Sequence, residues 1–333
     1  MYTLKQIPED FIVKEIFDIS RKLKDKGRFS YYTLRKRNYT TLQAIQKVAE
    51  QLHIELKNIS FAGNKDRRAV TEQAIAILGK GRELHLPGIE LRFLGYGDEP
   101  IRLGEHEKNE FIMTARNFDS KPALNSLEYF PNFFDKQRFS KNNPEIGKLL
   151  VKQDYKKAVE LLLENGNGAS IMKEALDARP NDYAGALRLL PRKLLKLYVH
   201  SYQSKLWNIV LARFLEKEHI DAGAIPERLD GLNIPILGFA TELENETIEA
   251  LYSEIMAEEQ ITARDFISRA MPELSSAGAV RHAFARIYGL ETVEKEDDEL
   301  NTGKQKIKIK FQLDTGCYAT TALAYLLHDR DAC

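Results

Sequence analysis

The chain has 333 residues, 43% of them hydrophobic, so it holds enough apolar material for one large domain or two ordinary ones. It contains no apolar run of about eighteen residues and no charged segment followed by an apolar one at its start, so we expect neither a membrane span nor a secretory signal. Its two cysteines, Cys317 and Cys333, form no CxxC pair, which argues against a disulfide framework or a zinc site and fits a reducing cytoplasm.

The formal net charge is zero, which taken alone argues against a nucleic-acid-binding protein. The charges are nevertheless segregated along the chain. Residues 20–38 are strongly basic with one acid, residues 191–214 contain five cations and no acid, and residues 241–260 contain seven glutamates and no cation. Such segregation can leave one face positive on a neutral protein, or it can mark solvated faces without a partner, and both interpretations are open.

The N-terminal part predicts mainly β-structure, because its apolar segments are rich in β-branched and aromatic residues. The predicted strands are 11–19, 28–36, 59–62, 72–78, 88–97 and 110–118. A helix is predicted over 40–54, capped by Thr40 or Thr41. Its apolar face is predicted to contain Leu42, Ile45, Val48, Ala49 and Leu52. A further helix is predicted to begin in 120–130, where a serine and a proline suit a first turn.

Helical patterns dominate after about residue 150, and a strand pattern returns near the end. The predicted helices are 154–165, 169–178, 182–190 and 193–218. The segment 305–313 alternates apolar residues with lysines and predicts a half-buried strand, and a helix over 322–329 follows. The simplest organisation is one α/β domain made from both termini, with a mostly helical segment inserted between them.

One carboxylate stands out in "FAGNKDRRAVTEQ" (61–73). Asp66 lies between Lys65 and a pair of arginines, directly after a predicted buried strand. A strand-to-loop turn with solvated charges is the plain interpretation of such a cluster. A Gly-Asn pair before Asp66 would allow a tight turn that presents the acid.

Two further segments combine aromatic and polar residues. They are "PNFFDKQRFS" (131–140) and "TGCYATT" (315–321). Aromatic rings can stack on a flipped-out base, an amide can bind its Watson–Crick edge, and an acid can act at its sugar bond. A single aromatic residue is more often part of a core, so the functional interpretation depends on these segments converging in space.

The segment 61–73 closely resembles the signature of the TruD family of tRNA pseudouridine synthases, which reads AGxKD-x-x-A-x-T-x-Q. Four other segments resemble family motifs and occur in the family's order. "PEDFIVKE" (8–15) resembles its N-terminal strand, and "PNFFDKQRF" (131–139) its PN-aromatic-F-G-x-QRF motif. "SYQSKLWN" (201–208) resembles a helix of its inserted domain, and 315–321 its G-x-aromatic-A-T turn. The resemblance therefore covers nearly the whole chain.

The resemblance implies an α+β fold. The catalytic domain of a pseudouridine synthase, with a mixed, mostly antiparallel sheet flanked by helices, would comprise residues 1–153 and 276–333. A mostly helical α/β TRUD domain would be inserted over residues 154–275.

The resemblance also implies a site. The catalytic aspartate falls on Asp66. The implied substrate-binding residues are Lys5, Phe11, Asn132, Phe134 and Tyr318. Phe134 corresponds to the ring that stacks on the base and Asn132 to an asparagine that contacts the substrate. Two departures affect the backbone, because Asp135 and Ser140 stand where the family usually has glycine. In a third, Tyr318 replaces the more familiar Phe and adds a hydroxyl group that needs a partner if buried.

The implied reaction converts uridine to pseudouridine in tRNA, at uridine 13 of the D arm, without cofactor or metal. The protein is expected to be a cytoplasmic monomer whose partner is tRNA. Asp66 could attack C1′ as a nucleophile or remove the C2′ proton to give a glycal, and both routes require its ionised form. Nearby cations favour that form, and whether Lys5, Lys65, Arg67 or Arg68 approaches Asp66 is open. Cations that do not approach it are expected to contact RNA phosphates.

Two other function classes compete. A non-catalytic RNA-binding protein or RNA chaperone of the same fold would keep the basic segments and the aromatic residues but would not need Asp66. A further alternative is a pseudouridine synthase that acts on a different RNA. A nucleotide-binding protein is disfavoured, because no G-x-x-x-x-G-K-[ST] sequence accompanies the Gly-Asn-Lys-Asp segment.

Overall fold

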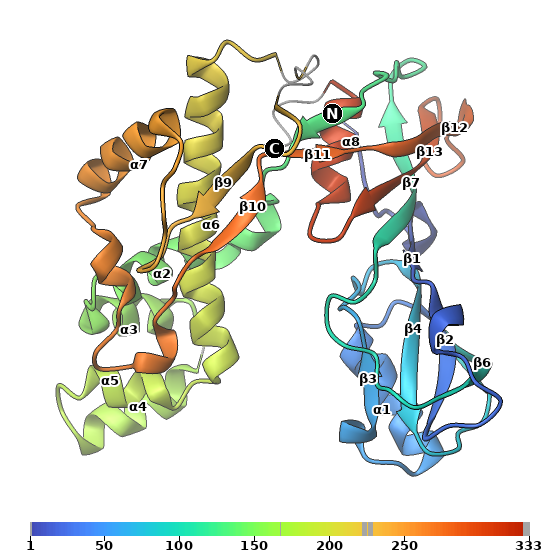
Figure 1. Ribbon diagram of the computed structural model, residues 1–333, viewed down its shortest axis with the longest axis horizontal. Coiled ribbons are helices and arrows are strands. Elements are labelled where there is room, and N and C mark those ends of the chain that lie inside the picture. The colour runs from blue at the N-terminus through green and yellow to red at the C-terminus, as the bar shows by residue number, and fades with distance from the viewer. Residues whose placement is uncertain (1, 167, 222–224, 226–228, 329–333) are drawn as a thin grey trace. The chain divides into compact units, whose positions relative to one another are not determined.

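A computed structural model describes residues 2–166, 168–221, 225 and 229–328 of the chain, so Cys333 lies outside the described residues. The chain forms two compact units (Figure 1). Of the described residues, the first unit contains 2–128 and 286–328, and the second contains those within 129–285. No helix in the described part of the chain is both long and apolar enough to cross a membrane.

The first unit is built on a nine-stranded sheet in the order β12-β13-β7-β1-β4-β2-β6-β5, with β3 paired to β4. Its strands are β1 (Phe11–Ile16), β2 (Phe29–Arg37), β3 (Ile59–Phe61), β4 (Val70–Leu78), β5 (Leu84–Leu86), β6 (Ile89–Gly97), β7 (Lys108–Phe118), β12 (Tyr288–Asp297) and β13 (Gln305–Asp314). Among the described strands of this sheet, β1 and β4 pair in parallel and the other pairs are antiparallel. The predicted mixed, mostly antiparallel sheet is confirmed.

Alternation along β13 matches its sequence pattern. Ile307, Ile309, Phe311 and Leu313 are fully buried, because successive side chains point to opposite faces of a strand. Next to this strand, β7 supplies Phe111, whose ring stacks on that of Phe311 with centroids 5.7 Å apart. These residues join the C-terminal strands to the N-terminal ones in one sheet.

Helix α1 (Thr41–Leu52) lies against this sheet, and α8 (Ala319–Leu326) follows β13. Thr40 caps α1 through a capping box, in which its side chain accepts from Gln43 N and Gln43 Oε1 accepts from Thr40 N. The predicted apolar face is wrong at Leu42, which is 58% exposed, and Ala44 takes its place in the core.

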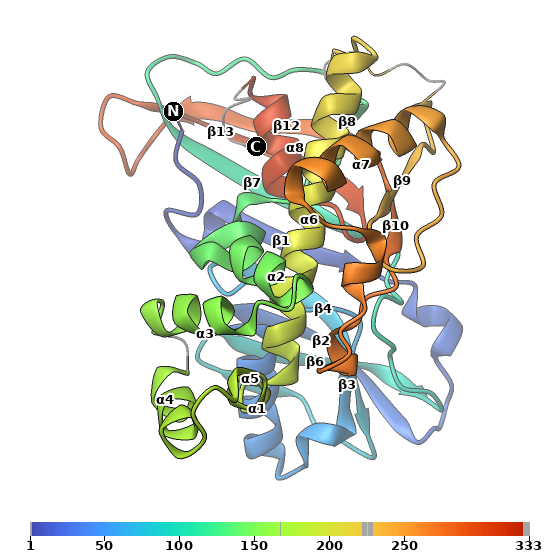
Figure 2. The same cartoon turned by 90° about the vertical axis from the view of Figure 1, so that its left-hand side faces the viewer.

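The second unit is mostly helical and carries short strands. Its helices are α2 (Asn143–Val151), α3 (Tyr155–Glu164), α4 (Ala169–Ala178), α5 (Tyr183–Arg188), α6 (Arg192–Lys217) and α7 (Glu246–Glu259). Its strand pairs are β9 (Asn233–Ile236) with β10 (Ala279–His282), and β8 (Tyr129–Pro131) with β11 (Phe284–Arg286). Figure 2 shows α6 running through this unit, with α2 and α7 packed against it. Trp207, fully buried on α6, donates to the carbonyl of Ile234 on β9 at 2.9 Å.

The expected domain edges, near 153 and 276, differ from the edges of the compact units at 128 and 286. The reason is local packing: α2 packs on α6, and β10 pairs with β9. Segments 129–153 and 276–285 therefore pack with the helical unit.

The predicted helix in 120–130 is wrong, because residues 121–128 form neither helix nor strand and lead into β8. Asn125 replaces helical bonding with contacts to the C-terminal end of α8. Its main-chain N–H donates to Leu326 O at 2.8 Å and its side-chain amide donates to Tyr325 O at 3.0 Å.

Candidate active site

Asp66 lies on the loop between β3 and β4, with 43% of its side chain exposed. The Nζ atom of Lys5 lies 2.6 Å from Asp66 Oδ2 and 3.9 Å from the centre of the Phe11 ring. Three of the residues implied by the resemblance are therefore together in the first unit. Lys5, which is 21% exposed, adopts a left-handed backbone conformation with φ 54°.

The other cations of the 61–73 motif have different partners. Lys65 Nζ lies 2.7 Å from Glu15 Oε1, and both side chains are almost fully buried. Arg68 donates to the main-chain carbonyl of Gln6 at 3.1 Å. Of the lysines and arginines considered from the sequence, Lys5 is the one that the structure pairs with Asp66.

Hydrogen bonds to buried side chains fix the loop before Asp66. Thr41 Oγ1 accepts from Lys65 N at 2.9 Å and donates to Gln73 Oε1 at 2.9 Å, while Gln73 Nε2 donates to Gly63 O at 2.9 Å. Gly63 does not have a positive φ, and a Cβ there would lie 3.2 Å from His106 Cε1, a tight contact. The expected tight Gly-Asn turn is wrong, because residues 63–66 form no turn.

His106 faces the buried Lys65–Glu15 pair, with Nδ1 3.6 Å from Glu15 Oε1. Burial lowers the pKa of His106, and the charge of Lys65 lowers it further although Glu15 opposes this. The imidazole is therefore neutral at pH 7 and adds no second cation beneath the loop.

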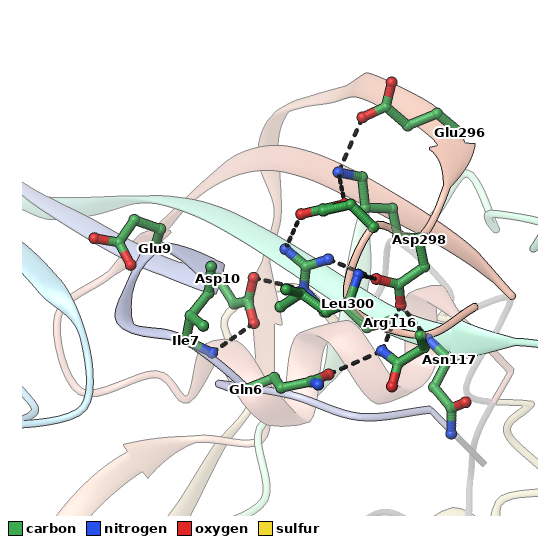
Figure 3. A network of polar contacts seen from close by, with 12 residues as sticks. Gln6, Ile7, Glu9, Asp10, Arg116, Asn117, Glu296, Asp298 and Leu300 are labelled. Atoms are coloured by element: carbon green, nitrogen blue, oxygen red, sulfur yellow. Dashed lines mark hydrogen bonds and ion pairs between the residues drawn. The ribbon is translucent and has the colours of Figure 1, made fainter.

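A buried polar network holds the segment that carries Lys5 (Figure 3). Arg116 on β7, 4% exposed, binds Asp10 through Nε at 2.8 Å and Asp298 through Nη1 at 2.7 Å. Asp10 in turn accepts from Ile7 N at 3.0 Å, and Thr3 pairs through its main chain with Arg116. Residues 3–10 are thereby fixed to β7 on both sides of Lys5.

The loop between β12 and β13 completes this network. Glu299 binds Arg116 Nη2 at 2.9 Å, and Asn301 donates to Gln6 Oε1 at 2.9 Å (Figure 3). Hydrogen bonds from Arg116 and Lys306 lower the pKa of Glu299 to about 2. A C-terminal loop thus supports the N-terminal segment of the site.

Phe11 and Tyr318 also lie in the first unit, and they differ in burial and in their neighbours. Phe11 is 5% exposed and its ring packs at a tilt on Phe111, with centroids 6.1 Å apart. Tyr318 is half-buried at the N-cap of α8, two residues after Gly316, whose φ is 84°.

The remaining implied site residues, Asn132 and Phe134, lie together in the second unit. Arg281 donates to both the main-chain carbonyl and Oδ1 of Asn132, at 2.8 and 2.7 Å. Its guanidinium carbon also lies 4.1 Å from the centre of the Phe134 ring. The side-chain amide of Asn132, a residue that is 4% exposed, donates to His282 O and so uses one of its two amide hydrogens.

The "SYQSKLWN" motif of α6 supports Phe134. Asn208 accepts from Phe134 N and donates to Phe134 O, both at 2.9 Å, and Trp207 meets the Phe134 ring edge-on at 5.5 Å. Phe134 is consequently 8% exposed, with hydrogen bonds to its main chain and aromatic packing against its ring.

Many cations of the basic segments are paired within the protein. In 20–38 the pairs are Arg21–Asp18, Lys22–Glu105, Lys24–Asp98, Arg35–Glu72 and Arg37–Glu9. On α6, Arg213 binds Glu258 of the acidic segment and Lys205 binds Glu145. Charge segregation in the sequence therefore overstates the positive charge left for a partner.

Sequence reasoning missed the supporting residues of both groups. They are Glu15, Lys36, Thr41, Gln73 and Arg116 in the first unit, and Asn208 and Arg281 in the second. Glu15 ends "PEDFIVKE", Gln73 ends the signature and Asn208 ends "SYQSKLWN", so the motifs contained a signal for these three.

The chain is similar to known proteins along its length. It matches the family model described as tRNA pseudouridine synthase D (TruD) over residues 2–173, 169–229 and 224–325. It is 30% identical to tRNA pseudouridine synthase D of Aquifex aeolicus, over 97% of each chain. It is also 30% identical to the probable tRNA pseudouridine synthase D of Methanosarcina acetivorans, over 96% of this chain and 91% of that protein.

A solved structure supports the same grouping. The crystal structure assigned to tRNA pseudouridine synthase D from Methanosarcina mazei matches with a TM-score of 0.76 and 26% identity, over 98% of this chain and 93% of that chain. Fold and sequence together define a pseudouridine synthase, an isomerase of the RNA-modifying class. Within that class the chain belongs to the TruD family.

Proposed function

We propose that this protein converts uridine 13 in the D arm of tRNA to pseudouridine and that Asp66 is its catalytic residue. The observation that carries the proposal is the pairing of Asp66 with Lys5, within a loop that matches the family signature. The relatives are named for pseudouridine formation in tRNA, and position 13 follows from the sequence resemblance. We further propose that the protein acts as a cytoplasmic monomer without cofactor or metal.

The isomerisation breaks the C1′–N1 bond, turns the uracil, and forms a C1′–C5 bond. The C5 proton leaves to solvent and N1 becomes protonated, so the formula of the nucleotide is unchanged. Asp66 either attacks C1′ or removes the C2′ proton, and each role needs a carboxylate accessible to the ribose. The 43% exposure of Asp66 satisfies this requirement, and the Lys5 ammonium lies 2.6 Å from its carboxylate.

The other implied residues receive binding roles in this proposal. Phe134 would stack on the flipped uracil, Asn132 would bind its edge through the unused amide hydrogen, and Phe11 and Tyr318 would line the site. We assign catalysis to a domain formed by both ends of the chain, 1–153 and 276–333, and support of the RNA to the inserted domain 154–275.

The test is to incubate the purified protein with unmodified tRNA transcripts and to map pseudouridine at nucleotide resolution. Product at position 13 supports the full assignment. Product at another position, or only in another RNA, refutes the target while the synthase chemistry stands. Tight tRNA binding without any product would instead favour a non-catalytic RNA-binding protein of the same fold.

A further inference from the structure

Lys36 on β2 is a buried lysine whose hydrogen bonds go to main-chain carbonyls. Its side chain is 1% exposed, and it forms no ion pair with a carboxylate among the described residues. Its Nζ donates to Tyr39 O at 2.7 Å and Asp66 O at 2.8 Å, with Lys65 O at 3.4 Å. The three N–H groups of the ammonium are thus directed at the turn before α1 and at the Asp66 loop.

The charged groups around Lys36 determine how strongly its ammonium form is favoured. Opposite it in the sheet lie Thr71 on β4 and Ile89 on β6, so neither strand places a charged residue across from it. The charges that face it are those of Asp66, which favours the ammonium, and Lys65, which opposes it. Burial lowers the pKa of Lys36 to about 8, so it is mostly charged at pH 7.

We propose that Lys36 is a positioning residue for Asp66: it holds the main chain of the loop from inside the unit, so that the carboxylate meets Lys5 at the surface. The inference rests on the proposed catalytic role of Asp66. Lys36 donates a hydrogen bond to the main-chain carbonyl of Asp66 itself. Thr41 and Gln73 bind earlier residues of the loop, Lys65 N and Gly63 O respectively. Of the three residues that bind the loop, Lys36 is the one that carries a charge, so its deprotonation weakens the hydrogen bond to Asp66 O.

The experiment compares Lys36→Met, which removes both donors and charge, with Lys36→Gln, which keeps amide donors without charge. Lys22→Met is the matched control, because Lys22 is also largely buried in this unit but pairs with Glu99 and Glu105 outside the motif. Thermal unfolding and tRNA binding establish that each variant is folded. Tritium release from tRNA labelled at C5 of uridine then gives kcat and KM between pH 6 and about 9.5, a window that spans the pKa of Lys36 near 8.

The expected result is a kcat reduced roughly 10²-fold in Lys36→Met, with KM little changed, because displacing a catalytic group by about 1 Å costs that much. Lys36→Gln should be intermediate, and Lys22→Met should match the wild type. The wild type should lose kcat as pH rises through about 8, and this decline should be absent from both Lys36 variants. Persistence of the decline in the variants, or a Lys36→Gln protein equal to Lys22→Met at every pH, would overturn the proposal.

A structural measurement separates this inference from the proposed function. In a crystal structure of Lys36→Gln, the Lys5–Asp66 distance should exceed about 4 Å, the limit for an ion pair. An unchanged 2.6 Å pair refutes the positioning role whether or not the protein is active. An inactive wild type with a displaced pair in the variant would refute the synthase assignment and leave the positioning role standing.

Discussion

Lys5 Nζ and Asp66 Oδ2 are 2.6 Å apart, although the two residues are 61 positions apart in the sequence. Both side chains are partly exposed, and an ion pair of that kind contributes only about 0–1 kcal/mol to stability. Buried side chains hold the two segments that carry the pair. Arg116 and Asp10 hold the Lys5 segment, and Thr41 and Gln73 hold the Asp66 loop. The arrangement is therefore better suited to orienting a carboxylate than to stabilising the fold.

We predict different effects for Lys5, which pairs with Asp66, and Lys65, which pairs with Glu15. Lys5→Met should lower kcat by at least tenfold with little change in unfolding free energy, because an exposed pair is lost. Lys65→Met should destabilise the protein by about 3–5 kcal/mol, because it leaves the buried Glu15 carboxylate without its partner. Urea unfolding together with tritium release measures both. Equal stability losses in the two variants would contradict this division of roles.

Asp66→Asn should abolish pseudouridine formation while tRNA binding survives. The amide keeps the size of the side chain but can neither attack C1′ nor take a proton, and phosphate contacts that supply most affinity are untouched. Tritium release and a binding titration are measured on the same preparation. Asp18→Asn, a change of an acid elsewhere on the surface of the same unit, is the control. Turnover within about tenfold of wild type would exclude Asp66 as the catalytic residue.

Local patterns predicted the strand β13 and the helix α6 well, because period-two and period-3.6 repeats are local signals, whereas the sheet class followed from the family resemblance. The sequence could not predict which cation meets Asp66, since Lys5 reaches it only after β1 and β4 pair in parallel. Nor could it assign Arg116, whose partners Asp10 and Asp298 come from opposite ends of the chain.

Charge patterns could not show which cations are paired, for the same reason. Within the run of cations in α6, the fold places Glu258 against Arg213 and Glu145 against Lys205. The segment at 120–130 has helix-start residues, yet the amide of Asn125 is used by α8. In each instance a long-range contact overrides a local preference.

Phe134→Ala should reduce activity far more than Phe134→Tyr, because a base stacked on an aromatic ring gains about 1–3 kcal/mol. Loss of a buried ring also leaves a cavity costing about 3–5 kcal/mol of stability, so unfolding must be measured in parallel. Phe266→Ala is the matched control, since Phe266 is a buried phenylalanine of the same unit that stacks on Tyr202. Equal activity losses in Phe134→Ala and Phe266→Ala would show that Phe134 is only part of the core.

Affinity for tRNA should fall steeply with salt despite the zero net charge, with the unpaired cations carrying the dependence. Lys193 and Lys196 at the start of α6 form no ion pair among the described residues. Replacing each by alanine should reduce the slope of log affinity against log salt by about 1. Lys205→Ala should reduce it less, because Glu145 already neutralises that charge. A flat salt dependence in the wild type would mean that the basic segments are only solvated surface.

Acid should weaken the network around Arg116 over a defined pH range. Arg116 and Lys306 lower the pKa of Glu299 from 4.5 to about 2, so the folded protein holds this proton less tightly than the unfolded chain does. Its stabilisation is present above about pH 4.5 and is lost as pH falls toward about 2. Because the carboxylate is 53% exposed, solvent screening keeps the effect small.

Glu299→Gln should therefore be less stable than wild type in urea at pH 7, and the difference should shrink between about pH 4.5 and 2. Glu291→Gln on β12 serves as the control, because Glu291 forms no ion pair in the described part of the chain. A difference that stays constant with pH would contradict the assigned pairing of Glu299 with Arg116.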